Sequence, residues 1–421
     1  MKDSRLFKRA LRSRNYRLFV LGQGTSLIGT WMQQVAMSWL VYRLTGSAML
    51  LGIIGFTSQV PSFFLAPIAG VFADRWDKRR LLFATQSLAL IQAAILAVLV
   101  LSGLIQIWQL IILSLLLGTI NAFDIPIRQS FVIQMVDNKA DLSNAIAINS
   151  SIVHATRLIG PTIAGIFVAS FGEGVCFAIN SVSYLAVILA LAAMNLSPYE
   201  IPKRGHRVLH ELLEGIRYSF GSKPIRFIIL LLALFSLVGM PYSVLIPVFA
   251  KEILHGDSHT YGFLMTATGC GAFFGAIYLA IRKSVLGLGL VVVRAPIIFG
   301  IGIIIFSISD IFILSMISLV LAGFGAMTLV ASCNTILQTI VEENMRGRVM
   351  SFFTMAFIGM SPFGSLIAGA LAGRIGVKET VIVGGICCLL SSFIFLRQLP
   401  LLRDVIKPIY INKGIVKEEV G

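Results

Sequence analysis

The chain has 421 residues, of which 57% are hydrophobic and only 13% are charged, and its formal net charge is +15. This composition excludes a soluble globular protein, because no soluble core could hide so much apolar surface, and it indicates that lipid surrounds most of the chain. The positive charge does not indicate a nucleic-acid partner, because the basic residues are scattered around the ends of apolar runs, where anionic lipid accounts for them.

Repeated apolar runs of about 20 residues predict membrane-spanning helices along the whole chain. The runs are continuously apolar and lack an alternation of period two, so helices are favoured over a membrane β-barrel. The predicted spans are 18–41, 48–73, 81–101, 107–127, 142–169, 174–194, 227–249, 259–281, 289–308, 311–334, 350–372 and 378–397. The sequence therefore predicts an all-α membrane protein with twelve transmembrane helices.

The distribution of basic residues predicts the orientation of the chain. A basic segment, residues 1–17, precedes the first span and is expected to lie as a helix on the membrane surface. Four of the 34 Lys and Arg residues would fall on the side opposite the N-terminus, and Arg157 would lie inside a span. The four are Arg43, Lys251, Arg374 and Lys378. The positive-inside rule then places both termini in the cytoplasm.

A hydrophilic linker, residues 197–224, divides the predicted spans into six plus six. Apolar side chains recur in it at helical spacing and predict an amphipathic helix on the inner leaflet: Leu209, Leu212, Leu213, Ile216 and Phe220. His206, His210 and Glu214 would share one face of that helix, but a solvated face is favoured over a metal site. The predicted parts are a cytoplasmic segment (1–17), a six-helix bundle (18–196), the linker (197–224), a second bundle (225–398) and a cytoplasmic tail (399–421).

The two halves repeat each other weakly. Gly46 and Gly52 follow the first predicted span as Gly256 and Gly262 follow the seventh, at the same offset. A second weak repeat surrounds Pro161 and Pro362 (GPTIAGIF and SPFGSLIAGAL). Two repeats at similar offsets, with a basic linker between them, indicate a duplicated six-helix unit.

The stretch GVFADRWDKRR, residues 70–80, concentrates charge between the second and third predicted spans. Together with the six-plus-six arrangement, it resembles the loop motif G-x-L-A-D-R-x-G-R-K/R of the major facilitator superfamily, with Asp77 at the usual Gly. The resemblance covers essentially the whole chain. It implies two pseudo-symmetric six-helix bundles and secondary transport by alternating access.

The resemblance implies that this loop is part of a cytoplasmic gating latch, which closes when the inner side closes. Asp74 would meet the positive N-terminus of the eleventh helix near Met345–Arg348. Lys78 or a neighbouring arginine would pair with Asp124, near the end of the fourth span. The expected latch residues are Gly70, Asp74, Arg75, Lys78, Arg79, Asp124 and Arg128. An ordinary solvated loop is the alternative interpretation.

The fifth span carries Gly160, Pro161 and Gly165, which resemble the hinge signature of exporters in this superfamily. Proline removes a backbone hydrogen bond and glycine admits close packing, so the helix would bend there against a partner in the other half; a tolerated kink is the alternative. The fourth span has Ser114 where drug–proton antiporters often carry a buried arginine, so the proton carrier is unassigned. The chain is most similar to the subgroup that contains enterobactin exporters and macrolide efflux proteins.

Polar side chains inside the spans are expected to face a cavity or a partner, because lipid cannot satisfy them. Arg157 would bind an anionic group of the cargo or pair with a carboxylate, and His154 would serve a proton path or be a hydrogen-bonded structural residue. Glutamines are better cavity candidates than Ser or Thr, which often bond back to their own helix. The candidates for the substrate or proton pathway are Thr30, Gln33, Gln34, Asn121, Asn149, His154, Arg157, Asn334 and Gln338.

The patterns predict a membrane transporter, and the resemblance implies that it lies in the bacterial inner membrane, exports hydrophobic or siderophore-like small molecules and uses the proton gradient. No Walker loop and no nucleophile–base arrangement occurs, so we expect no ATP-driven step, no cofactor and no enzymatic activity. A monomer in contact with anionic inner-leaflet lipids is expected, without a nucleic-acid partner. A lipid or lysophospholipid translocator, a solute importer and a non-transporting sensor or scaffold are the alternatives.

Overall fold

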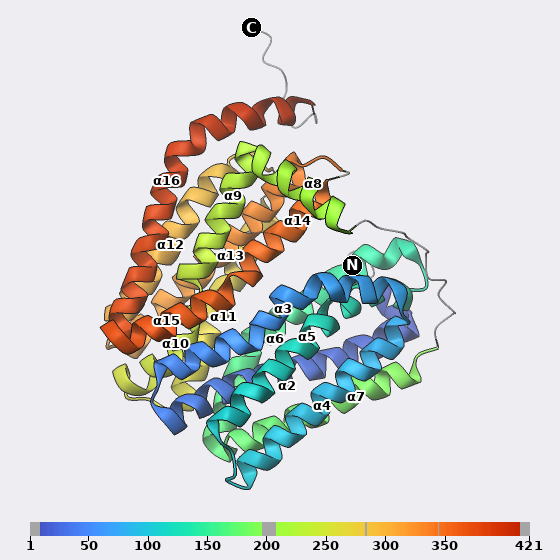
Figure 1. The fold of residues 1–421 in the computed structure, drawn as a ribbon, viewed down its shortest axis with the longest axis vertical. Helices are drawn as coiled ribbons and strands as arrows, with labels where there is room; N and C mark the ends of the chain where they lie inside the picture. Colours follow the sequence, from blue (N-terminus) through green and yellow to red (C-terminus); the bar gives the residue numbers. More distant parts are fainter. Residues whose placement is uncertain (1–8, 196–207, 283, 344, 413–421) are drawn as a thin grey trace, which may run out of the picture. The chain divides into compact units, whose positions relative to one another are not determined.

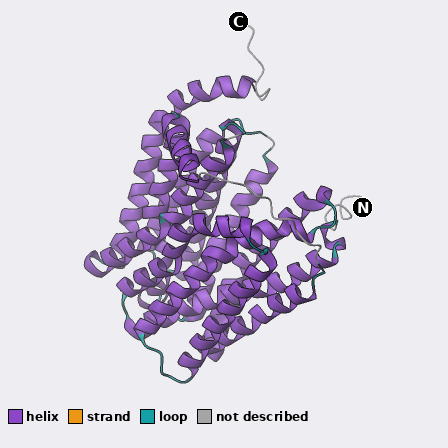
Figure 2. Ribbon diagram, turned by 45° about the vertical axis from the view of Figure 1, so that its right-hand side comes forward, coloured by secondary structure: helices purple, strands orange, loops and turns teal. Residues whose placement is uncertain are grey.

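The structure, a computed structural model, describes residues 9–195, 208–282, 284–343 and 345–412. At 66–68, 70–75, 139, 208–213 and 412 it describes the backbone and not the side chain. Helices make up nearly all of the described chain, which contains no strand (Figure 2). The all-α class predicted from the composition is thereby confirmed.

The chain forms two compact units. Unit 1 comprises Met1–Arg204 and Val244–Thr266, and unit 2 comprises Gly205–Ser243 and Ala267–Gly421. The units therefore do not follow the six-plus-six division of the sequence, because a segment from the second half, residues 244–266, packs with the first half.

Unit 1 is built from six long helices, which run back and forth and are joined by short turns (Figure 1). They are α2 (Arg14–Thr45), α3 (Ala48–Arg75), α4 (Lys78–Leu101), α5 (Ile107–Met135), α6 (Leu142–Phe171) and α7 (Glu173–Ala193). Short 3-10 turns, η1 (Ala10–Arg12) and η2 (Lys139–Asp141), precede α2 and α6. The turn after α2 requires glycine, because Gly46 has φ 60° in the left-handed region. Asp77 caps α4 by accepting a hydrogen bond from the Arg80 amide (3.1 Å).

Unit 2 contains the linker helix and most of the helices of the second half (Figure 1). These are α8 (Val208–Gly221), α9 (Lys223–Leu234), α12 (Leu288–Ile308), α13 (Phe312–Ile340), α14 (Arg346–Thr354), α15 (Ser361–Ile375) and α16 (Val377–Asn412). Two helices, α10 (Tyr242–Val248) and α11 (Ser258–Ile281), begin in one unit and end in the other. Three π-helical segments interrupt the α-helices: η3 (Phe235–Gly239), η4 (Phe249–Ile253) and η5 (Met355–Gly359).

Eleven helical segments of the described chain are long and apolar enough to cross a membrane, by length and composition alone. The helix α2 has 32 residues but is not among them, and Gln23, Gln33 and Gln34 interrupt its apolar sequence. Membrane-spanning helices are thus confirmed as the building blocks, while the number twelve is not confirmed. The largest differences from the predicted ends are in α5 and α16, which continue to Met135 and Asn412.

Two of the predicted spans are not single α-helices. The span Lys223–Ile253 consists of α9, η3, α10 and η4, and the span Arg346–Ile375 consists of α14, η5 and α15. A π turn holds one extra residue and disturbs the regular backbone hydrogen bonds. In unit 2, the Ser236 hydroxyl of η3 donates to the backbone carbonyl of Phe357 in η5. A side chain of η3 therefore satisfies a backbone carbonyl of η5.

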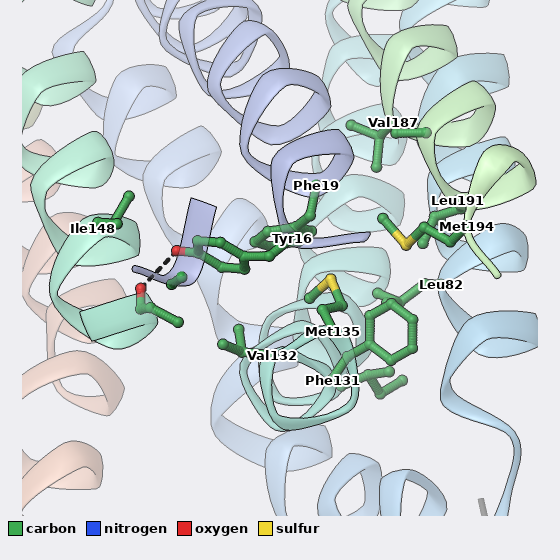
Figure 3. Packing of buried hydrophobic residues seen from close by; sticks show 14 residues of the cluster. Tyr16, Phe19, Leu82, Phe131, Val132, Met135, Ile148, Val187, Leu191 and Met194 are labelled. Carbon is green, nitrogen blue, oxygen red and sulfur yellow. Dashed lines mark hydrogen bonds between the residues drawn. The ribbon is translucent and has the colours of Figure 1, made fainter. Parts of the chain in front are cut away.

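The end of unit 1 at which α2 begins holds a large apolar cluster (Figure 3). Its buried members are Ala10, Tyr16, Phe19, Leu82, Ile127, Phe131, Val132, Met135, Ala145, Ile148, Val187, Ala190, Leu191 and Met194. The Tyr16 hydroxyl donates to the Ala145 carbonyl and the Ser13 hydroxyl to the Met135 carbonyl, both at 2.6 Å. Within residues 10–16, Ala10, Ser13 and Tyr16 are buried in the bundle and Arg12 and Arg14 are exposed, so the contact of this segment with the membrane surface stays a prediction.

The linker helix α8 contacts α14 within unit 2. Glu214 Oε2 lies 2.7 Å from Arg348 Nη1, and a Cβ added at Gly215 would lie only 3.1 Å from the Phe352 ring. The predicted amphipathic helix is therefore helical over Val208–Gly221 and packs against protein; its contact with lipid stays a prediction. Residues 197–207 of the predicted linker lie outside the described residues.

Candidate substrate and proton pathway

Polar side chains form one face of α6. Ser150, His154 and Arg157 follow one another at helical spacing; the first two are exposed and Arg157 is half-buried, as is Asn149 beside them. A guanidinium is charged at any physiological pH, and in a membrane it costs several kcal/mol unless water or a partner compensates it. The predicted face thus lies on α6, a helix that also carries other polar residues among its apolar ones.

The two glutamines of α2 have different environments. Gln33 is 2% exposed, and Gln34 is exposed. Gln33 Nε2 donates to Gln92 Oε1 of α4 (3.0 Å), and Asn180 Nδ2 of α7 donates to Gln33 Oε1 (2.6 Å). Gln92 Nε2 in turn donates to the Leu113 carbonyl of α5 (3.1 Å). This amide network joins four helices, so the geometry gives Gln33 a structural role and leaves Gln34 as the pathway candidate.

The remaining pathway candidates lie at three places. The Thr30 hydroxyl bonds back to the Ser26 carbonyl (2.9 Å), as serines and threonines in helices often do. Asn121 of α5 is half-buried. On α13 of unit 2, Gln338 Nε2 donates to Asn334 Oδ1 (2.9 Å). That these side chains contact cargo stays a prediction.

Asp124 of α5 is buried, with 3% of its surface exposed. Its Oδ1 accepts hydrogen bonds from the Thr85 hydroxyl (2.9 Å) and from Gln86 Nε2 (2.7 Å), both on α4. Its Oδ2 lies 3.3 Å from Nε of Arg128, one turn along α5. The expected partner was Lys78 or a neighbouring arginine of the charged loop. The structure instead provides Arg128 and two neutral side chains.

Arg79 has a different role from the predicted one. Its guanidinium donates to the carbonyls of Leu191 (3.0 Å) and Ala192 (3.1 Å), which lie in the last turn of α7. A cation at a helix C-terminus satisfies free carbonyls and the helix dipole. Arg79 therefore stabilises the end of α7, and it does not pair with Asp124.

The remaining expected latch residues are Gly70, Asp74, Arg75 and Lys78. The side chains of Gly70, Asp74 and Arg75 lie outside the described residues, and Lys78 is half-buried in the first turn of α4. Arg348, at the expected docking point of Asp74, is paired with Glu214 of α8. The latch between the two halves stays a prediction.

The small residues of α6 allow a close backbone contact with the start of α11. A Cβ added at Gly165 would lie 2.6 Å from the Ser258 carbonyl, and one added at Gly262 would lie 2.6 Å from the Pro161 carbonyl. The Ser258 hydroxyl donates to the Gly165 carbonyl (3.2 Å). Gly160 likewise approaches Trp31 of α2 too closely for a Cβ. In this structure α6 is one uninterrupted helix, and its glycines serve close packing.

Aromatic and polar contacts also connect residues 244–266 to the rest of unit 1. Trp39 of α2 stacks on Tyr261 with ring centroids 6.3 Å apart, and the Tyr42 hydroxyl donates to Glu252 Oε1 (3.3 Å). The ammonium of Lys251 lies 5.5 Å from the Tyr42 ring. Our sequence interpretation missed these contacts, although the glycines of α6 and α11 could have indicated them.

A bidentate ion pair joins the end of α2 to the start of α7. Arg43 Nε and Nη2 donate to Glu173 Oε1 (2.7 Å) and Oε2 (3.1 Å), and the Glu173 side chain is buried while Arg43 is half exposed. A carboxylate is favourable at this position because it lies in the first turn of a helix. This pair was not predicted.

No group of three or more His, Cys, Asp or Glu residues suited to a metal ion occurs among the described residues. The side chains of His206 and His210, the histidines considered for a metal site in the sequence, lie outside the described residues.

Comparison with known proteins identifies the family. Residues 9–407 match the family model of transmembrane secretion effectors, MFS_3. The staphyloferrin A transporter of Staphylococcus aureus is 28% identical, over 88% of this chain and 93% of its own length. The multidrug efflux pump Tap of Mycolicibacterium fortuitum is 23% identical, over 90% of this chain and 94% of its own length. A solved POT family transporter in complex with 5-aminolevulinic acid has the same fold, with a TM-score of 0.72, 13% identity and coverage of 93% of this chain and 97% of that one.

The apolar helices and these relatives together indicate a multi-pass protein of the bacterial plasma membrane. Because the family model covers nearly the whole described chain, the protein belongs to the transmembrane secretion effectors, a family of transporters in the major facilitator superfamily.

Proposed function

We propose that this transporter exports hydrophobic or siderophore-like small molecules by alternating access and that the proton gradient drives it. The named relatives, a staphyloferrin A transporter and a multidrug efflux pump, support this class of cargo. The observation that carries the proposal is the polar face of α6, with half-buried Arg157 and exposed His154 inside a membrane-spanning helix.

Arg157 indicates which chemical groups the cargo carries. Its guanidinium carries a permanent positive charge, which would attract an anionic or strongly polar group of the cargo inside the membrane. Two apolar side chains, Val153 and Ile159, are exposed beside the polar face. A cargo with an apolar body and a carboxylate or similar acceptor satisfies both properties.

The proposal includes the arrangement of the protein in the membrane. Both termini lie in the cytoplasm, and the exposed Arg12, Arg14, Arg17 and Arg80 contact anionic lipid of the inner leaflet. The protein works as a monomer without a cofactor, a bound metal or a nucleic-acid partner, and it catalyses no covalent reaction.

Export from energised cells tests this function. Cells that express the protein are loaded with a carboxylate siderophore, a macrolide or a lipophilic dye, and release is followed with and without an uncoupler. We expect uncoupler-sensitive release of at least one compound, its loss in Arg157→Ala at unchanged membrane expression, and its retention in Arg374→Ala, which removes an exposed arginine of unit 2.

Other outcomes would assign a different function. Uptake in place of release would indicate an importer. Faster lipid flipping without release of any panel compound would indicate a lipid translocator. Wild-type export by Arg157→Ala would remove Arg157 from the cargo site.

A further inference from the structure

An arginine lies on the outer face of α12 in unit 2, inside a helix long and apolar enough to span the membrane. Arg294 is the one charged residue of α12 and lies in its second turn. The exposed side chains of α12 are Arg294, Ile301 and Ile308, which follow one another at intervals of about two helical turns. The opposite face, with Phe299 and Ile303, is buried. Arg294 therefore belongs to an outward face that is otherwise apolar.

A second arginine lies on the exposed face of α16, the helix that packs beside α12 (Figure 1). Its side chain is the one charged group among the exposed residues of α16 between Thr380 and Leu399, which are Val383, Ile386, Leu390, Phe393, Ile394, Leu396 and Arg397. The guanidinium of Arg397 lies 4.7 Å from the centroid of the Phe393 ring. This cation–π contact attracts the guanidinium and leaves its charge in place.

The two helices are antiparallel, and two contacts between them fix their register. A Cβ added at Gly289 would lie 2.9 Å from Leu399 Cδ1, and the Ser392 hydroxyl donates to the Val293 carbonyl. Residue 397 therefore lies about one turn closer than residue 294 to the end of unit 2 at which α12 begins and α16 ends. Both arginines lie near that end, on the exposed faces of neighbouring helices.

The direction of the side chains reduces this difference in depth. A side chain on a helix leans toward the N-terminus of that helix. Arg294 accordingly leans toward the end of unit 2 at which α12 begins. Arg397 leans the opposite way, because α16 ends there, and its contact with the ring of Phe393, one turn earlier, agrees with this direction. The two guanidinium groups thus approach the same level of the membrane.

The positive charge of this face is not balanced by the protein. Arg282, at the end of α11 (Ser258–Ile281), donates to the carbonyls of Ser284 (3.3 Å) and Leu286 (2.5 Å). The described residues provide no such acceptor for Arg294. An arginine that faces lipid is costly unless its long side chain brings the guanidinium to water or to an anionic group.

The one acidic side chain on α12 and on the described part of α16 at this end is Asp404, which is exposed about two turns beyond Arg397. Arg403 and Lys407 lie on the same segment of α16 and are also exposed, so this end of the two helices has a positive net charge. An anionic partner is therefore favoured over a neutral one.

We propose that Arg294 and Arg397 bind the phosphate of an anionic phospholipid. A guanidinium binds phosphate oxygens through two parallel hydrogen bonds, and basic sites between membrane helices suit anionic headgroups. From this position the acyl chains run into the membrane along the exposed Ile301 of α12 and Leu390 of α16. The site goes beyond export and does not rest on it; in the arrangement proposed above, it lies in the inner leaflet.

Lipid titration of the full-length protein in a neutral detergent tests the site, with native mass spectrometry to measure the affinity for the first bound lipid. The wild type should bind phosphatidylglycerol and cardiolipin more tightly than phosphatidylcholine. Arg294→Gln and Arg397→Gln should each weaken phosphatidylglycerol binding about fivefold, because each removes one cation. Arg294→Lys, which keeps the charge, should bind more tightly than Arg294→Gln. Arg374→Gln, which removes an exposed arginine at the opposite end of unit 2, should bind as the wild type does.

Wild-type affinity in both glutamine variants would overturn the proposal, and so would equal affinity for phosphatidylcholine. Inorganic phosphate distinguishes a lipid site from a site for free anions: a rise in the unfolding temperature with phosphate alone, lost in both glutamine variants, would indicate the latter. Both substituted side chains are exposed, so the variants should fold. Export of a panel compound without selective lipid binding overturns this inference alone, and selective binding without export of any compound overturns the proposed function alone.

Discussion

Replacing Gln33 by leucine tests whether this residue holds the bundle together or contacts cargo. The substitution keeps the volume of the side chain and removes both hydrogen bonds of its amide. Asn180 Nδ2 loses its acceptor at 2.6 Å, and Gln92 Oε1 loses its donor at 3.0 Å. Both orphaned groups are on residues with no exposed surface, so water cannot easily replace the lost partner.

The size of the effect depends on the reference state. In soluble proteins an orphaned buried polar group costs about 1–3 kcal/mol, which would give about 2–6 kcal/mol for two groups. Between membrane helices a polar contact averages about 0.6 kcal/mol and reaches about 1.7, because the dissociated helices in lipid also find partners. The network lies inside a helical bundle in a membrane, so the second range applies. We expect a destabilisation of about 1–3 kcal/mol.

The measurement is the unfolding of purified protein in detergent, combined with cargo affinity. Gln33→Leu should lower the unfolding temperature or denaturant midpoint and leave the Kd for an exported compound nearly unchanged. Gln34→Leu is the matched control, because it makes the same chemical change on the exposed neighbour. If Gln33→Leu kept wild-type stability and lost cargo affinity, the structural role of the amide network would be refuted.

Three further predictions concern contacts that we did not predict from the sequence. Gly262→Val should weaken the packing of α11 on α6 by about 1–3 kcal/mol and slow export, because its Cβ meets the Pro161 carbonyl at 2.6 Å, whereas Gly373→Val, with open space around it, should export normally. Arg43→Gln should lower thermal stability by about 1–3 kcal/mol, because it leaves the buried Glu173 carboxylate unpaired, and Glu173→Gln in the same chain should restore part of the loss; no restoration would contradict the pairing. Glu214→Arg should increase hydrogen exchange in α8, and adding Arg348→Glu should reverse the increase; the pair is partly exposed, so the effect corresponds to at most about 1 kcal/mol.

The sequence predicted most of the helical architecture because lipid imposes a simple rule, namely a continuous apolar run of about 20 residues for each crossing. The start of α3 at Ala48 and both ends of α12, for example, agree with the predicted span to within a residue. The rule does not report what happens beyond the hydrocarbon layer. The chain stays helical at the polar end of α5 and after Pro400 in α16, because packing and local hydrogen bonds continue there. Hydropathy detects neither of these interactions.

The candidate site was harder to predict, because a polar side chain in a span looks the same whether it binds a neighbour or a cargo. Gln33 and Gln34 are adjacent and identical in type, yet about 100° apart around α2, so one meets Gln92 and Asn180 and the other is exposed. Only the three-dimensional partners separate them. The partner of Asp124 was missed for a similar reason: a local pair with Arg128 was available one turn away, and the resemblance directed attention to the charged loop.

The two polar clusters that α4 forms with its neighbours differ in how completely their hydrogen bonds are satisfied. Around Gln92, the amides of Gln33 and Asn180 bind neutral groups through fixed donors and acceptors, so the network has one satisfied state and rigidifies that part of the bundle. Around Gln86, the Thr85 hydroxyl and the Gln86 amide donate to the Asp124 carboxylate, but Gln86 Oε1 is buried without a hydrogen-bond partner, so that cluster is less completely satisfied. The network around Gln33 is therefore expected to contribute more to the rigidity of unit 1 than the cluster around Gln86.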